Sequence, residues 1–158
     1  MLNELQKQTL AAALRAETNV DVVAAIAPGI RNDVFLAAWC NAASATDAWN
    51  PSLEAKALFE ASDVSKFDNL TAGKRDAWRM MLDFAPIDFS RNKMRKAVTD
   101  TWGATDSVAV LQACTRKATN GEAYLGGNSA TENTVTALKL SVPGNISLDD
   151  VSNSLNAY

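Results

Sequence analysis

Two helix patterns separated by a proline fill residues 70–102, and this stretch constrains the fold more than any other. In the first pattern, which follows a helix-capping residue at Thr71, apolar side chains recur at i, i+1, i+4, i+5 and i+8 and so share one helix face. Pro86 ends that helix, because proline has no amide hydrogen and clashes with the preceding turn. Ser90 or Asp88 then caps a second helix with a similar apolar face. We therefore expect residues 70–102 to form two packed helices at the centre of the fold.

Similar patterns predict that most of the chain is helical. The core is expected to form around Trp78, Met81, Met94 and Trp102, which lie on the apolar faces of the two central helices. Gly103 ends the second of these helices, since glycine readily adopts the backbone conformation found just past a helix end. Further helices are expected at residues 2–16, 20–27, 32–42, 52–61 and 105–118.

The helical pattern changes in three places. Residues 43–51 are rich in Ser, Thr, Asp, Asn and Pro, and we expect them to form a loop that carries Trp49. The stretch 126–133, GGNSATEN, is also expected to be a loop. It precedes residues 135–142, VTALKLSV, in which apolar and polar side chains alternate as in a strand. A lone strand needs a partner, which is either residues 123–125 or another subunit.

These features define the expected fold class, which is mainly α: a compact bundle of about six or seven helices with a small β hairpin or strand in the C-terminal third. The length of 158 residues suits one domain with a core of its own. We expect residues 1–158 to form this single helical domain, with 121–145 as an arm of loop and strand. Apolar residues make up 47% of the chain and charged residues 21%, which is typical of a folded globular protein.

The composition excludes several kinds of catalytic and metal site. The chain has no histidine, so a Ser-His-Asp triad, a Cys-His dyad and any metal site with a histidine ligand are impossible. The two cysteines, Cys40 and Cys114, lie far apart in sequence and are expected to be buried and reduced. Carboxylates are scattered around expected helix ends, where the helix dipole favours them. We therefore predict no catalytic, cofactor-binding or metal-binding residue, no cofactor and no enzymatic activity.

The strongest local charge feature lies within residues 74–96. The net charge of the whole chain is −3, which excludes a globally basic nucleic-acid-binding protein. Three interpretations of the segment remain open: a solvated helix surface, a docking surface for an acidic partner, or a phosphate-binding surface. Sequence-specific binding of nucleic acid is not expected, since base-reading side chains interleaved with aromatics are not evident. The basic residues are Lys74, Arg75, Arg79, Arg91, Lys93, Arg95 and Lys96.

Three apolar residues complete the predicted partner interface. Trp49 lies in an expected loop, and a large aromatic there either pins the loop to the core or contacts a partner. Leu138 and Leu140 lie in the expected strand, which another subunit can extend by adding a strand of its own. No apolar run approaches the roughly 20 residues needed to cross a bilayer, so no membrane association is expected.

Four groups of residues carry a resemblance to a known family. They are 67–75 (FDNLTAGKR); 91–95 (RNKMR) with Trp102 and Gly103; 116–119 (RKAT) with Glu122, Gly126 and Gly127; and 138–142 (LKLSV) with Gly144 and 148–151 (LDDV). Through these groups, over about residues 30–156, the chain resembles a family of small structural proteins of tailed bacteriophages that are encoded among head and tail genes.

The resemblance implies a subunit of the neck, where the head of the virion joins the tail. On that basis we expect a ring-forming head-tail connector, or adaptor, that joins portal to tail and is found in the virion after assembly in the cytoplasm of the host bacterium. Its partners would be copies of itself in a homo-oligomeric ring and portal, neck or tail proteins. The alternative is a small DNA-binding or regulatory phage protein that uses the basic residues within 74–96.

Overall fold

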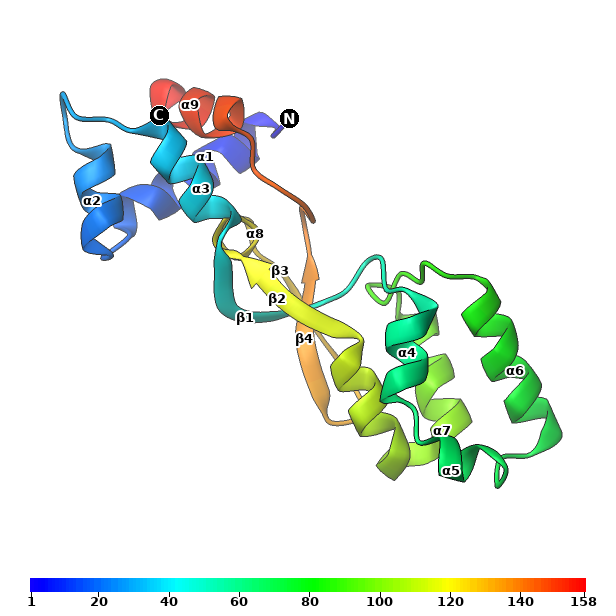
Figure 1. Cartoon of the computed structure of the whole chain (residues 1–158). Helices are drawn as coiled ribbons and strands as arrows, with labels where there is room; N and C mark the ends of the chain where they lie inside the picture. Colours follow the sequence, from blue (N-terminus) through cyan, green and yellow to red (C-terminus); the bar gives the residue numbers. More distant parts are fainter. The chain divides into compact units, whose positions relative to one another are not determined.

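The computed structural model describes all 158 residues, which form two compact units, each with its own apolar core. Unit 1 consists of Met1–Thr46, Lys117–Gly127 and Leu140–Tyr158, and unit 2 consists of Asp47–Arg116 and Asn128–Lys139. The boundary between the units falls within each of four β-strands, so the chain alternates between the units along its length. Figure 1 labels the elements of both units.

Unit 1 is built from five helices. They are α1 (Glu4–Ala16), α2 (Val20–Ile26), α3 (Asp33–Asn41), α8 (Asn120–Leu125) and α9 (Leu148–Ala157). The first three follow asparagines whose side chains accept hydrogen bonds from backbone N–H groups and so satisfy donors at the helix ends. α1 packs against α8 and α9, so the first and last helices of the chain are neighbours. The core residues of unit 1 are Leu2, Leu10, Leu14, Val22, Ala25, Leu36, Cys40, Ile146 and Val151.

Two close contacts fix the packing of unit 1. Gly121 in α8 lies so near its neighbours that a Cβ atom there would be 2.5 Å from Ile146 Cγ1. At the start of α9, the buried Asp150 accepts a hydrogen bond from the Leu2 amide at 2.8 Å. Burial alone would raise the pKa of Asp150, but hydrogen bonds from the Leu2 amide and from the serine that caps α9 outweigh burial and lower the pKa. Asp150 therefore ties the start of α1 to α9 as a carboxylate.

Unit 2 contains the other four helices. They are α4 (Ala55–Ala61), α5 (Val64–Phe67), α6 (Ala72–Asp83) and α7 (Asn92–Ala113). α7 is broken at Gly103, whose φ of 80° and ψ of 174° are not helical. Glycine adopts a positive φ without the steric penalty of a side chain, so the break falls at this residue. The core residues of unit 2 are Trp49, Leu53, Leu58, Trp78, Met81, Ile87, Phe89, Val98, Trp102, Val110, Leu111, Cys114, Val135 and Ala137.

Four strands form one sheet in the order β2-β1-β4-β3. They are β1 (Ala43–Trp49), β2 (Thr115–Thr119), β3 (Gly127–Glu132) and β4 (Val135–Leu140). β1 and β4 are parallel, with Ala48 opposite Leu138. β3 and β4 form a hairpin across Asn133, whose φ of 53° is in the left-handed region that asparagine tolerates. The sheet is therefore mixed, and β4 has a strand on each side.

The expected fold class is wrong. The chain is not a helical bundle with one small hairpin or strand but an α/β protein with nine helices and a four-stranded mixed sheet. The strand predicted at 135–142 is confirmed as β4, but its predicted partner at 123–125 lies in α8. The loops expected at 43–51 and 126–133 contain β1 and β3, and the end of the helix expected at 105–118 forms β2.

The missed strands share a physical property. β1, β2 and β3 consist mostly of small or polar residues, so they lack the apolar alternation that identifies a strand in a sequence. Hydrogen bonds to strands far away in the chain hold β1 and β2, and pairing with β4 in the hairpin holds β3. The helices expected from residues 2–16, 20–27, 32–42 and 52–61 are confirmed, as is the break at Gly103.

The expectation of a single domain with an arm at 121–145 stays a prediction. Two compact units in one chain do not by themselves show which parts fold independently. Residues 121–145 contain most of α8 and all of β3 and β4.

Candidate functional site

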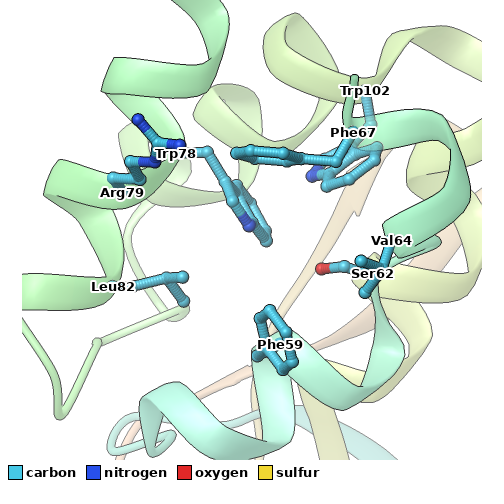
Figure 2. Close-up of a pocket in the computed structure, with 8 residues that line it drawn as sticks. All are labelled: Phe59, Ser62, Val64, Phe67, Trp78, Arg79, Leu82 and Trp102. Carbon is cyan, nitrogen blue, oxygen red and sulfur yellow. The ribbon is translucent and has the colours of Figure 1, made fainter. Parts of the chain in front are cut away.

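The helices of unit 2 enclose a small apolar pocket, shown in Figure 2. Its volume is about 160 Å³. Side chains of α4, α5, α6 and α7, with Ser62 just after α4, line the pocket. The side chains that line it point toward one shared space. They are Phe59, Ser62, Val64, Phe67, Trp78, Arg79, Leu82 and Trp102.

Two tryptophans form the inner wall of this pocket. Trp78 on α6 and Trp102 on α7 meet edge to face, with ring centroids 5.3 Å apart and ring planes at 89°. This arrangement places the positive edge of one ring against the negative face of the other. Phe67 of α5 packs on Trp102 with centroids 6.4 Å apart. Contacts among three helices therefore hold the wall in place.

Neither indole nitrogen of this wall donates a hydrogen bond to the protein. Trp78 is only 2% exposed and Trp102 only 6% exposed, yet the Nε1–H of each has no acceptor within the chain. The other two tryptophans, Trp39 and Trp49, donate their Nε1–H to acceptors at 2.9 Å. Buried indole N–H groups usually find such a partner. The pocket wall therefore contains one fully buried donor without a partner, Trp102 Nε1–H, and one donor that is not fully buried and has no acceptor in the chain, Trp78 Nε1–H.

The rim of the pocket is apolar and carries one cation. Phe59 and Val64 are each about half exposed. Arg79 places its guanidinium over the ring of Phe67, 5.5 Å from the centroid, in a cation–π contact. The nearest carboxylate to this guanidinium, that of Asp76, is 3.8 Å away. The rim thus offers both an apolar contact area and a positive charge.

A second apolar surface lies on another face of α6. The side chain of Met80 is 60% exposed and that of Phe84 is 71% exposed. Together with Met94 and Ala97 of α7 they line an open hollow of about 470 Å³. We call these four residues the α6–α7 surface. Large apolar side chains that lie together in solvent often mark a binding surface.

The basic residues predicted to form a docking cluster differ in their surroundings. Arg91 and Lys96 each lie 3.0 Å from a carboxylate three or four residues away, and Arg79 lies 3.8 Å from one. These exposed pairs contribute about 0–1 kcal/mol each, but they offset the positive charge of the segment. Lys74 and Lys93 form no ion pair. Their role in partner contact stays a prediction.

Two arginines of the predicted cluster bind the backbone instead of a carboxylate. Arg75 donates to a backbone carbonyl oxygen at 3.0 Å. Arg95 is 4% exposed and donates from Nη1 to the carbonyl oxygens of Phe89 and Ser90, each at 2.8 Å. Its guanidinium also lies 4.9 Å from the ring centroid of Trp49, which is itself buried. Burial lowers the pKa of Arg95. The structure therefore places these two predicted interface residues, Arg95 and Trp49, against each other inside unit 2.

The other two predicted interface residues, Leu138 and Leu140, are half-buried in β4. Because β4 lies between β1 and β3, its backbone is not at an edge of the sheet. The edge strands are β2 and β3. A strand added by another subunit would therefore pair with one of these edge strands.

The remaining reactive groups are tied into the cores. Cys40 and Cys114 are buried and unpaired, as expected, and burial raises the pKa of each thiol to about 12. Burial and the neighbouring carboxylate of Glu17 raise the pKa of Tyr124 to about 12. No group of three or more Cys, Asp or Glu residues lies close enough together to hold a metal ion. None of the helices combines the length and the apolar character that a membrane crossing requires.

Part of these surfaces was predictable from the sequence. Trp78 and Trp102 were expected in the core, and they are buried, but nothing in the sequence showed that a pocket lies beside them. Met80 and Phe84 were not singled out. A signal was present, because they lie four residues apart, outside the apolar face predicted for their helix, and so form a second apolar stripe.

Comparisons with known proteins found no family model, no curated protein and no solved structure that matches this chain.

Proposed function

We propose that this protein is a structural subunit that acts by binding other protein chains, and that it forms part of the head-tail connection of a tailed-phage virion. The exposed α6–α7 surface supports the first half of this proposal. Only the resemblance of the sequence to small phage structural proteins supports the second half.

The observation that supports protein binding is the exposure of Met80 on α6 and of Phe84 immediately after the end of that helix. Complete burial of a Met or Phe side chain contributes about 1.5–3 kcal/mol, so covering these two would contribute about 2–4 kcal/mol to association. Charges of both signs border the surface, with Asp76 beside the larger hollow and Arg91 beside an adjoining one. A protein surface can match such mixed charges, whereas a polyanion such as DNA matches only the positive ones.

In a virion, this surface would bind a neighbouring copy of the chain in a ring or a portal, neck or tail protein. Such a role needs no enzymatic activity and no cofactor. A symmetric ring presents the same surface many times, so a modest contact at each copy suffices for a stable assembly.

The first test removes the exposed apolar groups from the surface. We expect the mass of the wild-type protein in analytical ultracentrifugation to rise with concentration above the 16.9 kDa of one chain. The double variant Met80→Ser/Phe84→Ser should stay at the mass of one chain. The control is the double variant Val20→Ser/Ile30→Ser, which removes two similarly exposed apolar groups from unit 1 and should assemble like the wild type.

The second test determines where the protein lies in the particle and which proteins it contacts there. Cross-linking mass spectrometry of purified particles of the encoding phage should detect the chain and should link residues near Met80 to another copy or to a portal, neck or tail protein. The proposal fails if the chain is absent from the particles. It also fails if Met80→Ser/Phe84→Ser assembles and cross-links like the wild type.

A further inference from the structure

We propose that the pocket between α4, α5, α6 and α7 receives one tyrosine side chain of a partner protein, whose hydroxyl oxygen accepts a hydrogen bond from Trp78 Nε1–H. This inference rests on the proposed function, that the chain binds other proteins, and it names a residue type that the partner supplies. It concerns a different face of α6 from the α6–α7 surface, because the two hollows share no residue.

The size of the pocket fits one aromatic ring. Its volume is about 160 Å³, and an apolar cavity of about 150 Å³ is known to hold one benzene molecule. The lining consists of aromatic and aliphatic side chains apart from Ser62 and Arg79. A single planar apolar group, and not a longer peptide segment, therefore fills this space.

The indole N–H of Trp78, which has no acceptor in the chain, distinguishes a tyrosine from a phenylalanine. The Trp78 ring points into the space between Phe59, Leu82 and Trp102 in Figure 2, and its N–H has no acceptor in the chain. Trp102 Nε1 is fully buried, so Trp78 is the donor that an incoming group can reach. A water molecule could accept this hydrogen bond but would leave the aromatic walls without a packing partner. A phenol ring supplies both the apolar face and the acceptor oxygen.

The rim favours a protein as the source of this ring. Phe59 and Val64 expose apolar surface outside the pocket, which a free phenol-sized molecule would leave in water. Interface anchors are typically aromatic side chains that enter a pocket while the surrounding residues exclude water. Arg79 at the rim can also interact with an acidic residue next to the partner's tyrosine.

The test uses p-cresol, which reproduces a tyrosine side chain, and toluene, which reproduces a phenylalanine side chain. Each is titrated into the ¹⁵N-labelled full chain while the indole N–H signals of the four tryptophans are recorded by NMR. We expect p-cresol to bind with a Kd of about 1 mM and to move the Trp78 signal downfield, as hydrogen bonding requires. Toluene should bind about fivefold more weakly, since it lacks one net hydrogen bond.

The matched variants are Trp78→Phe and Trp39→Phe. Trp78→Phe keeps an aromatic wall but removes the N–H, so p-cresol should lose its fivefold advantage over toluene. Trp39→Phe removes an indole from unit 1 and should leave the advantage unchanged. If Trp78→Phe does not fold, the indole signals of the wild type still decide the question, because they can be assigned through space.

Three results overturn the inference: equal affinity for toluene and p-cresol, a Trp78 indole signal that neither compound moves, or an advantage for p-cresol that survives in Trp78→Phe. Equal affinity for toluene and p-cresol would indicate that the pocket binds a hydrocarbon side chain instead of a tyrosine. None of these results depends on assembly, so they are distinguishable from a failure of the proposed function, which appears in the sedimentation of Met80→Ser/Phe84→Ser.

Discussion

Replacing Arg95 with methionine should destabilise the protein strongly, although Arg95 belongs to a segment rich in surface charge. Its guanidinium donates two hydrogen bonds of 2.8 Å to Phe89 and Ser90 and lies 4.9 Å from the ring centroid of Trp49. Hydrogen bonds of a charged group contribute about 1.5–3 kcal/mol each, and a desolvated cation–π contact contributes about 2 kcal/mol. The net loss of stability in Arg95→Met should be smaller than the sum of these contributions, because the variant no longer buries a cation. We therefore expect the free energy of unfolding to fall by about 2–4 kcal/mol.

Urea unfolding followed by circular dichroism at pH 7 measures this change. Lys96→Met is the matched control, because Lys96 is exposed and pairs only with Asp100, and it should change the free energy of unfolding by less than about 0.5 kcal/mol. Arg95→Lys keeps the charge but not the planar fork of donors, so its loss should be intermediate. In a double-mutant cycle, Trp49→Phe should couple to Arg95→Met by about 0.5–2 kcal/mol.

The result that refutes this reasoning is a loss in Arg95→Met no larger than that in Lys96→Met. The buried guanidinium would then contribute nothing net to the turn at Phe89 and Ser90. Zero coupling with Trp49→Phe, despite a large loss in Arg95→Met, would refute only the cation–π part.

Two further predictions concern Gly121 and Asp150 of unit 1, with Gly73 of unit 2 as the comparison for Gly121. Gly121→Ala should lower the free energy of unfolding by about 2 kcal/mol or more, because the new Cβ would lie 2.5 Å from Ile146 Cγ1; Gly73→Ala, in an open helical position, should instead raise it by about 0.4–1 kcal/mol. Asp150 has a pKa below its ordinary value of 3.8 in the folded chain, so its stabilising effect is present above that pH and is lost as the pH falls through the folded pKa. In urea unfolding, Asp150→Asn should therefore cost about 1 kcal/mol at pH 7 and less at pH 3, and an equal cost at both values would contradict this assignment.

The helices were predictable because their signals are local. Caps such as Thr71, breakers such as Gly103 and apolar repeats of helical period all lie within one or two turns of the residues that they specify. Local signals of this kind did not predict strands β1, β2 and β3 of the sheet. β1 has the sequence ASATDAW, whose small and polar residues fit a loop as well as a strand, and its parallel pairing with β4 joins Ala48 to Leu138 across most of the chain.

The candidate binding surfaces were less predictable than the helices, for two different reasons. The pocket exists because several helices pack without filling the space beside Trp78 and Trp102, and a gap of this kind depends on three-dimensional packing. The exposure of Met80 and Phe84, by contrast, follows from their position off the buried face of α6, which a helical projection of the sequence shows. The burial of Arg95 had no local signal, because its neighbours Lys93 and Lys96 are exposed and look the same in sequence.

The alternation of the chain between its two units has a consequence for its synthesis. Residues 47–116 leave the ribosome together, but the core that they begin also needs Val135 and Ala137 of the later hairpin. In the same way, Leu10 of the first helix packs in a core that includes Val151 of the last. Neither core is complete until most of the chain has been translated, so the nascent protein carries uncovered apolar helix faces for most of that time. Chains cut short by premature termination should therefore be substrates for chaperones and proteases instead of small folded fragments.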